Sequence, residues 1–201
     1  MKIGILGAST MGIGLIQICA QHGFEVVYRA RRQESVNAAK DKVLGNYEFM
    51  ISNGWLTPEE RDASMARITG STDIELLKDA DFVIEAASEN MGTKKELFRQ
   101  LDEMCRPEVI LATNTSSLSV TEIASVTKRD DKVIGMHFFN PAPVMKLIEV
   151  IAGLNTPEET VEKIKEISVS IGKTPVQVKE AAGFVVNRIL IPMINEAVGI
   201  Y

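Results

Sequence analysis

Short apolar runs rich in β-branched residues alternate with longer amphipathic stretches along most of the chain. The apolar runs predict strands at residues 3–6, 26–28, 68–70, 82–85, 109–112, 133–136, 147–150 and 176–178. The stretches between them predict helices near residues 12–22, 35–53, 58–65, 74–78, 93–105, 119–125, 157–170 and from 183 onward. This alternation is typical of successive βα units, so we expect an α/β fold with a mostly parallel sheet and helices on both faces.

Two of the expected helices begin with the same four residues, Thr-Pro-Glu-Glu, at 57–60 and at 156–159. Each pairs a threonine that can cap the helix with proline in the first turn and glutamate three residues after the cap. The sequences around them are unlike, which indicates capping chemistry rather than an internal repeat. We therefore expect Thr57 and Thr156 to start helices.

Residues 35–65 make an unusually long crossover between the second and third expected strands. They predict a helical hairpin that turns at residues 53–55 and projects from the sheet. Two interpretations stay open for it. The hairpin is either an enlarged crossover that only packs, or a surface that contacts a ligand.

The length of 201 residues fits one large domain, or one domain with part of another. Hydrophobic residues make up 45% and charged residues 24%, which excludes a disordered or coiled-coil chain. The net charge of −5 argues against a nucleic-acid surface and against an anionic membrane surface as partners. Lys2 and the uncharged residues 3–20 imitate a signal peptide, but the four glycines in that stretch favour a strand, a turn and a helix.

Cysteine and histidine are too few and too scattered to predict a metal site. The chain has two cysteines, Cys19 and Cys105, and two histidines, with no Cys-x-x-Cys pattern. We expect both thiols to be buried and unreactive, and we expect the protein to work in the reducing cytoplasm.

A glycine-rich turn follows the first expected strand. The segment Gly7-Ala8-Ser9-Thr10-Met11-Gly12 leads from that strand into a helix, which is the context of a dinucleotide-binding loop and of a Rossmann-type sheet. Gly7 permits the tight turn and Gly12 lets helix and strand pack closely, while the helix start offers amides to a pyrophosphate. Ser9 stands where a glycine is usual, so we expect its side chain either to crowd the phosphate or to hydrogen-bond it.

The second expected strand ends without the carboxylate that usually binds the adenosine ribose of NAD. Ala30, Arg31 and Arg32 follow Arg29 there instead. Guanidinium groups bind phosphate through charge-assisted hydrogen bonds, whereas a carboxylate would repel a 2′-phosphate. We therefore expect NADP(H) to be preferred, with NAD(H) as the alternative cofactor; an ordinary solvated turn remains the competing interpretation of the arginines.

Polar side chains follow the later strands at their carboxyl ends, where open α/β sheets bind ligands. Asn114 and Ser116 follow the fifth strand, and His137 and Asn140 follow the sixth. His137 is the preferred general acid and base, because imidazole titrates near neutrality. Glu149 on the next strand is expected to orient that imidazole; a surface ion pair with Lys146 is the alternative.

Together these motifs closely resemble the short-chain L-3-hydroxyacyl-CoA dehydrogenase family. The resemblance covers essentially the whole chain and is nearest to the bacterial 3-hydroxybutyryl-CoA dehydrogenases of butyrate and fatty acid metabolism. It rests on the segments Gly-x-x-x-Met-Gly, Ala-Ser-Glu-Asn, Asn-Thr-Ser-Ser-Leu-Ser, His-Phe-Phe-Asn-Pro-Ala-Pro-Val-Met-Lys-Leu-Ile-Glu-Val and Gly-Phe-Val-Val-Asn-Arg.

The resemblance implies an oxidoreductase that transfers hydride reversibly between a nicotinamide cofactor and an acyl-CoA substrate. It implies His137 as catalytic acid and base with Glu149 as partner, and it places Ser116 and Asn187 on the substrate's 3-oxygen. It places Glu89, Lys94 and Asn140 around the nicotinamide half of the cofactor. The helical hairpin is then expected to help hold CoA.

Family members also have a helical C-terminal domain that closes the site and forms a homodimer. We expect residues 1–182 to form the dinucleotide-binding domain and residues 183–201 to begin a C-terminal domain that is cut short. The apolar helix from 184 to 198 is expected to be buried on more than one side in a complete protein and kinked at Pro192. Without the missing domain, its apolar face is expected to be open to association. Two alternatives remain: a cofactor-binding module that cannot turn over, or a related hydroxy-acid dehydrogenase of the gulonate type.

Overall fold

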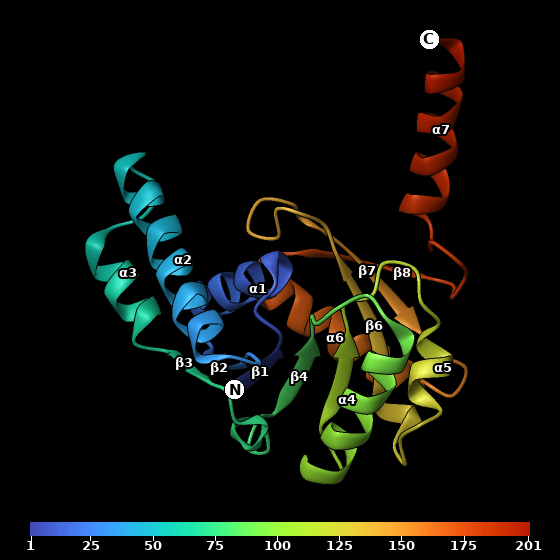
Figure 1. Ribbon diagram of the computed structural model, residues 1–201, viewed down its shortest axis with the longest axis horizontal. Helices are drawn as coiled ribbons and strands as arrows, with labels where there is room; N and C mark the ends of the chain where they lie inside the picture. The colour runs from blue at the N-terminus through green and yellow to red at the C-terminus, as the bar shows by residue number, and fades with distance from the viewer.

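The computed structural model describes residues 1–201 and contains one eight-stranded sheet in the order β3-β2-β1-β4-β5-β6-β7-β8 (Figure 1). The strands are β1 Lys2–Leu6, β2 Glu25–Arg29, β3 Ile68–Ser71, β4 Phe82–Glu85, β5 Ile110–Thr113, β6 Val133–Phe138, β7 Leu147–Ala152 and β8 Thr174–Val178. Every neighbouring pair is parallel except β6 with β7. The expected mostly parallel, Rossmann-type sheet is confirmed.

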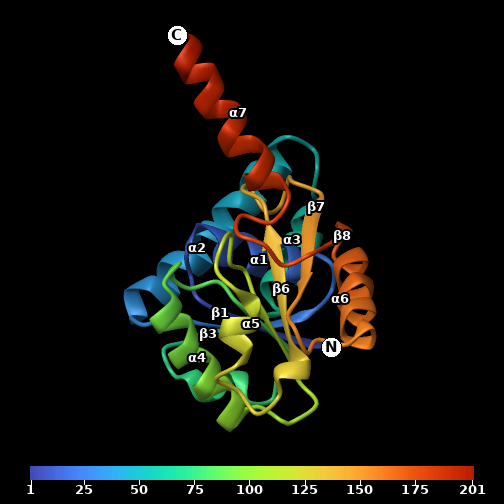
Figure 2. The same cartoon turned by 90° about the vertical axis from the view of Figure 1, so that its right-hand side faces the viewer.

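Helices cover both faces of this sheet, as Figure 2 shows for α6 on one side and α4 and α5 on the other. The helices are α1 Thr10–Gln21, α2 Gln33–Ser52, α3 Pro58–Met65, α4 Met91–Met104, α5 Val120–Ala124, α6 Glu158–Ser170 and α7 Val186–Ile200. The expected helix at residues 74–78 is only a 3-10 turn, η1 Ile74–Leu77. A second 3-10 turn, η2 Asp130–Lys132, precedes β6.

The core lies in two layers, one on each face of the sheet. Apolar residues of α1, α2 and α6 pack against one face, with Leu15, Val43 and Ile164 fully buried. Those of α4 and α5 pack against the other, with Phe98 and Ile123 fully buried. Burying both faces makes the central strands almost continuously apolar, which explains the sequence pattern.

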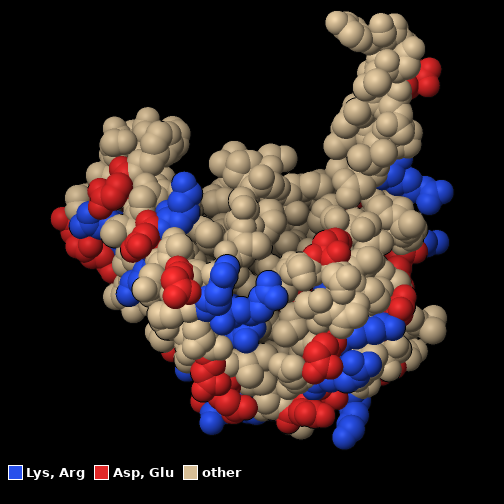
Figure 3. All heavy atoms as spheres, in the orientation of Figure 1, with Lys and Arg blue, Asp and Glu red and all other residues tan.

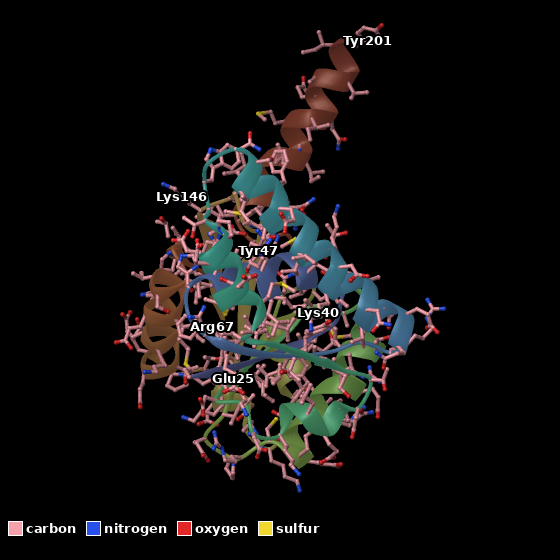
Figure 4. The ribbon with its side chains drawn as sticks, turned by 90° about the vertical axis from the view of Figure 1, so that its left-hand side faces the viewer. Glu25, Lys40, Tyr47, Arg67, Lys146 and Tyr201 are labelled. Atoms are coloured by element: carbon pink, nitrogen blue, oxygen red, sulfur yellow. The ribbon has the colours of Figure 1, made fainter.

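The long crossover forms the expected hairpin of α2 and α3, and it projects from the sheet beside α1 (Figure 4). Tyr47 anchors it: the ring is fully buried and its hydroxyl donates a 2.8 Å hydrogen bond to the Gln17 carbonyl on α1. Thr57 starts α3 with a complete capping box, in which Glu60 returns a hydrogen bond to the Thr57 amide. The predicted start of α3 is therefore confirmed.

The matching prediction for Thr156 is wrong. Helix α6 begins at Glu158, with Pro157 at the cap position and no side-chain cap. The Thr156 hydroxyl instead donates to the Val133 carbonyl and accepts from the Gly153 amide, at 2.6 and 3.0 Å. The hydroxyl that the local sequence predicts as a helix cap thus bonds instead to β6 and to the turn after β7.

None of the residues of helix α7 is buried, which agrees with the expectation for this helix where no further domain covers it. It extends away from the body of the molecule, as Figure 1 shows, and the apolar side chains of Ile189, Met193 and Val198 are exposed. No other element of these 201 residues packs around it, so burial on several sides does not occur within this chain. The helix continues through Pro192. No helix in the chain combines the length and apolar character needed to cross a membrane.

Candidate active site

The glycine turn after β1 is built as a dinucleotide loop requires. Gly7 has φ of +126°, and a Cβ there would lie 2.6 Å from the Ala86 carbonyl oxygen. A Cβ on Gly12 would lie 2.2 Å from the Gly7 carbonyl oxygen. Neither position tolerates a side chain, because the turn presses against the end of β4 and against the first turn of α1. Thr10 and Met11 begin α1 directly above this turn.

The Ser9 side chain has two hydrogen-bond partners within the protein. Its hydroxyl accepts a 3.3 Å hydrogen bond from the Gly12 amide and donates a 2.9 Å bond to the Ala86 carbonyl. Its φ of −70° is ordinary backbone, so glycine is not needed at this position. Ser9 caps α1 and ties the loop to the end of β4, because its hydroxyl finds both partners within the protein.

A cleft of about 740 Å³ opens above this loop, between the carboxyl ends of β1, β2 and β4. Ala30, Arg31 and Arg32 line it. Arg29 is bonded to the Thr72 carbonyl at 3.1 Å, but Arg31 and Arg32 are exposed and form no ion pair. Figure 3 shows basic side chains gathered below the hollow between the hairpin and α7. The cradle of Gly7 and Gly12 and the free guanidinium groups fit a phosphate-bearing dinucleotide.

His137 and Glu149 meet across the antiparallel pair of β6 and β7, where the register places them directly opposite. His137 Nδ1 lies 2.7 Å from Glu149 Oε2, and both side chains are nearly buried. The other oxygen, Glu149 Oε1, accepts from the amides of Val185 and Val186 at 3.0 and 2.9 Å. The carboxylate therefore holds the imidazole and the start of α7 together, and it forms no pair with Lys146.

Two aromatic rings flank the His137 imidazole. The ring centroids of Phe139 and Phe184 lie 4.5 and 5.6 Å from that of the imidazole. With Nδ1 donating to Glu149, Nε2 has no hydrogen-bond partner in the chain. The ring is thus fixed in one orientation, with the second nitrogen left for a ligand.

Glu89, Ser116 and Asn187 are brought together from three separate segments. Glu89 Oε1 accepts from the Ser116 amide at 2.7 Å and from the Ser116 hydroxyl at 3.1 Å. Thr115 donates to the same oxygen at 2.6 Å. Partial burial would raise the pKa of Glu89, but these bonds and Lys94 outweigh it and lower that pKa. Asn187, in the first turn of α7, donates to the Ser116 carbonyl at 3.2 Å.

Lys94 does not face the cleft. Its side chain is fully buried, and its ammonium lies 2.9 and 2.8 Å from the two carboxylate oxygens of Glu85. Glu89 is its second partner, at 3.4 Å. Sequence reasoning missed Glu85, although a carboxylate that ends an apolar strand was the available signal. Any part that Lys94 plays toward a cofactor is indirect in this arrangement.

The two remaining predicted residues lie at the ends of β5 and β6. Asn114 Oδ1 accepts from the Phe138 amide at 3.0 Å and so joins the ends of both strands. Asn140 is exposed beside a second cavity of about 400 Å³, which lies between the α2 and α3 hairpin and the turn after β6. Thr10 lines the same cavity, so this cavity adjoins the glycine loop.

Both cysteines are buried, as expected. Burial raises the pKa of the Cys19 thiol to about 12 and that of Cys105 to about 11, so neither is a reactive thiolate at neutral pH.

The fold, the glycine loop and the His137–Glu149 pair define an NAD-binding oxidoreductase domain of the Rossmann type. Residues 2–181 match the family model of the 3-hydroxyacyl-CoA dehydrogenase NAD binding domain, and the chain belongs to that family. It is 50% identical to 3-hydroxybutyryl-CoA dehydrogenase of Clostridioides difficile over all 201 of its residues, which is 72% of that relative. It is 44% identical to 3-hydroxyadipyl-CoA dehydrogenase of Escherichia coli over 97% of this chain and 41% of the relative.

Solved structures agree with the sequence comparison. The crystal structure of (S)-3-hydroxybutyryl-CoA dehydrogenase from Ralstonia eutropha superimposes with a TM-score of 0.95 at 46% identity. The match covers 98% of this chain and 69% of that one.

Proposed function

We propose that this domain serves a reversible dehydrogenase of 3-hydroxyacyl-CoA, with 3-hydroxybutyryl-CoA and acetoacetyl-CoA as the preferred pair. The observation that carries the proposal is the 2.7 Å contact of His137 with Glu149 beside the Ser116 and Asn187 cluster. Relatives named for 3-hydroxybutyryl-CoA, at up to 50% identity, support the substrate.

His137 moves the proton in the proposed reaction. A bound nicotinamide supplies or accepts the hydride. During reduction of a 3-keto group, protonated His137 gives its Nε2 proton to the forming alkoxide; during oxidation it takes that proton back. Glu149 keeps Nδ1 protonated and stabilises the imidazolium, because its carboxylate accepts from Nδ1 at 2.7 Å.

Ser116 and Asn187 polarise the 3-oxygen in this proposal. A hydroxyl and an amide are suitable donors for a developing oxyanion. In the structure the Ser116 hydroxyl donates to Glu89 and Asn187 donates to the Ser116 carbonyl. Both donors must therefore turn from these partners to the substrate oxygen.

The cavity beside the hairpin is the proposed place for part of the CoA moiety. Apolar and polar side chains of α1 and the hairpin line one side of it, and the turn after β6 lines the other. Phe49 and Trp55 stand at its rim with ring centroids 6.0 Å apart, and both rings are largely exposed. Exposed aromatic faces suit an adenine ring and an acyl-carrying arm. This position favours the hairpin as a ligand surface over a purely packing role.

NADP(H) is the proposed preferred cofactor, and NAD(H) the alternative. Ala30 lines the cleft where a ribose-binding carboxylate is usual, and the exposed Arg31 and Arg32 are free to bind a 2′-phosphate. Steady-state kinetics with both cofactors tests this directly. A higher kcat/KM with NADPH is expected, and a higher kcat/KM with NADH would contradict it.

Fluorescence titration separates the proposed activity from its alternatives. NADPH is titrated with the protein, first alone and then with acetoacetyl-CoA. Binding followed by oxidation supports the dehydrogenase, whereas binding without oxidation supports a module that cannot turn over alone. Oxidation of NADPH by a keto acid in place of the acyl-CoA, with the matching hydroxy acid as product, would support the gulonate-type alternative.

We further propose that residues 183–201 begin a helical C-terminal domain and that the full-length protein is a homodimer. The exposed apolar side chains of α7, among them Ile189 and Met193, support an association surface there. Sedimentation of the full-length protein as a monomer at micromolar concentration would contradict the dimer.

A further inference from the structure

Glu85 is a fully buried carboxylate at the end of β4. Its two oxygens take hydrogen bonds from three groups: the Lys94 ammonium, the Ala87 amide at 2.7 Å and the Thr113 hydroxyl at 2.8 Å. A charge enclosed in this way is stable only with such partners, since burial of an unpaired carboxylate is costly. Glu85 therefore ties together β4, β5 and α4 beneath the candidate site.

The Lys94 ammonium is shared unequally between two carboxylates. It lies 2.8 and 2.9 Å from the oxygens of Glu85 but 3.4 Å from Glu89 Oε2. Glu85 is enclosed, whereas the Glu89 side chain is 38% exposed, so the pair with Glu85 is the less screened of the two. Held by Glu85, the ammonium leaves Glu89 Oε1 turned toward Ser116.

We propose that Glu85 is a positioning residue for hydride transfer. By holding the Lys94 ammonium, it keeps Glu89 bonded to the Ser116 backbone amide, and thereby fixes the backbone of the residue that supplies the donor hydroxyl and the carbonyl bonded by Asn187. The chain of contacts runs from Glu85 through Lys94, Glu89 and Ser116 to Asn187, each step within 3.4 Å. The kinetic meaning of this inference rests on the proposed function; the positioning itself does not.

The variant Glu85→Gln tests the positioning in the structure. A carboxamide has one acceptor oxygen where the carboxylate has two, so the ammonium loses part of its binding and moves toward Glu89. A crystal structure of the variant is expected to show a shorter distance from Lys94 Nζ to Glu89 Oε2. The Glu89 Oε1 to Ser116 amide distance, 2.7 Å in the native protein, is expected to exceed hydrogen-bond range.

The same variant tests the consequence for the reaction. Misplacing Ser116 is expected to lower kcat for acetoacetyl-CoA reduction by about ten- to a hundredfold, while the Kd of NADPH changes little. The double variant Glu85→Gln with Lys94→Met removes the displaced ammonium and leaves the Glu89 to Ser116 bonds intact. Its kcat is expected to exceed that of the single variant, a recovery that a merely structural pair would not give.

Asp102→Asn is the matched control, because Asp102 also lies on α4 and forms a nearly buried ion pair, with Arg129, away from the site. It is expected to lower stability without changing kcat. An unchanged Glu89 to Ser116 contact in the crystal structure, or a double variant no faster than the single one, would overturn the inference. If the native enzyme fails to reduce acetoacetyl-CoA, the proposed function fails, and the crystallographic comparison still decides the positioning.

Discussion

His137 and Glu149 lie opposite each other on the one antiparallel pair of the sheet, with 2.7 Å between Nδ1 and Oε2. The second oxygen of Glu149 accepts hydrogen bonds from the amides of Val185 and Val186, at the start of the helix that carries Asn187. One carboxylate thus sets both the orientation of the imidazole and the placement of a second polar side chain of the site.

Glu149→Gln is expected to lower kcat by about a hundredfold or more. A carboxamide has one acceptor oxygen, so it can accept either from the imidazole or from the two backbone amides. Its NH2 group then faces the remaining N–H donor, with which it cannot form a hydrogen bond. Steady-state kinetics of acetoacetyl-CoA reduction measures the loss. Glu162→Gln, on the exposed face of α6, is the control, and a kcat within twofold of native for Glu149→Gln would refute the assigned role.

Ala30→Asp is expected to shift the cofactor preference toward NAD(H). The new carboxylate can bind the ribose hydroxyls and repels a 2′-phosphate. The ratio of kcat/KM for NADH to that for NADPH should rise by at least about tenfold, since losing a charge-assisted phosphate contact costs of order 1.5–3 kcal/mol. Arg31→Ala should lower the kcat/KM for NADPH without raising that for NADH. If the ratio of the two kcat/KM values is unchanged in both variants, the proposed phosphate site is disproved.

Arg129→Met is expected to lower the free energy of unfolding by about 3–5 kcal/mol, because it strands the nearly buried Asp102 carboxylate. The guanidinium also donates to the carbonyls of Cys105 and Arg106, which closes the end of α4. Urea unfolding measures the change, and the Kd of NADPH at low temperature serves as the control. A loss below about 1 kcal/mol would place this pair among ordinary surface ion pairs.

Glu180 is expected to make stability depend on acid pH. Burial would raise its pKa, but bonds from Thr121 and Ser119 outweigh burial and lower the pKa below its usual value. A lowered folded-state pKa contributes stability above the unfolded pKa of about 4.3, and that stability is lost as pH falls through the folded pKa.

Glu180→Gln should therefore be less stable than the native protein at pH 7, by about 1–2 kcal/mol. The difference should shrink as pH falls below about 4.3, because both proteins then carry a neutral side chain there. Urea midpoints across this range supply the measurement. A difference that stays constant with pH would contradict the account.

The sequence predicts the sheet and the ends of its strands because those features depend on local pattern and on a loop that only glycine can build. The pairing of His137 with Glu149 can also be predicted from the sequence, since the two residues lie on consecutive strands. The hydrogen-bond partners of hydroxyl groups cannot be predicted in this way. The bonds of Ser9 to Ala86 and of Thr156 to Val133 join segments that are far apart in the chain. The exposed state of α7 depends on what surrounds the helix, which no property of its own residues determines.

The burial of Lys94 shows the same limit for charge. The family resemblance implies that Lys94 lies near the cofactor, whereas its ammonium is enclosed by Glu85 and Glu89. Which of several nearby carboxylates a lysine meets depends on side-chain geometry at the ends of β4 and α4. A charged residue that ends an apolar strand is the sequence signal most worth following in such sheets.

The most direct test of the central claim measures two quantities on His137→Gln: the rate of NADPH oxidation with acetoacetyl-CoA, and the Kd of NADPH. The account expects kcat to fall by about 10²- to 10⁴-fold, since the proton donor is lost, while the Kd stays close to native. Turnover at the native rate by this variant would contradict the account.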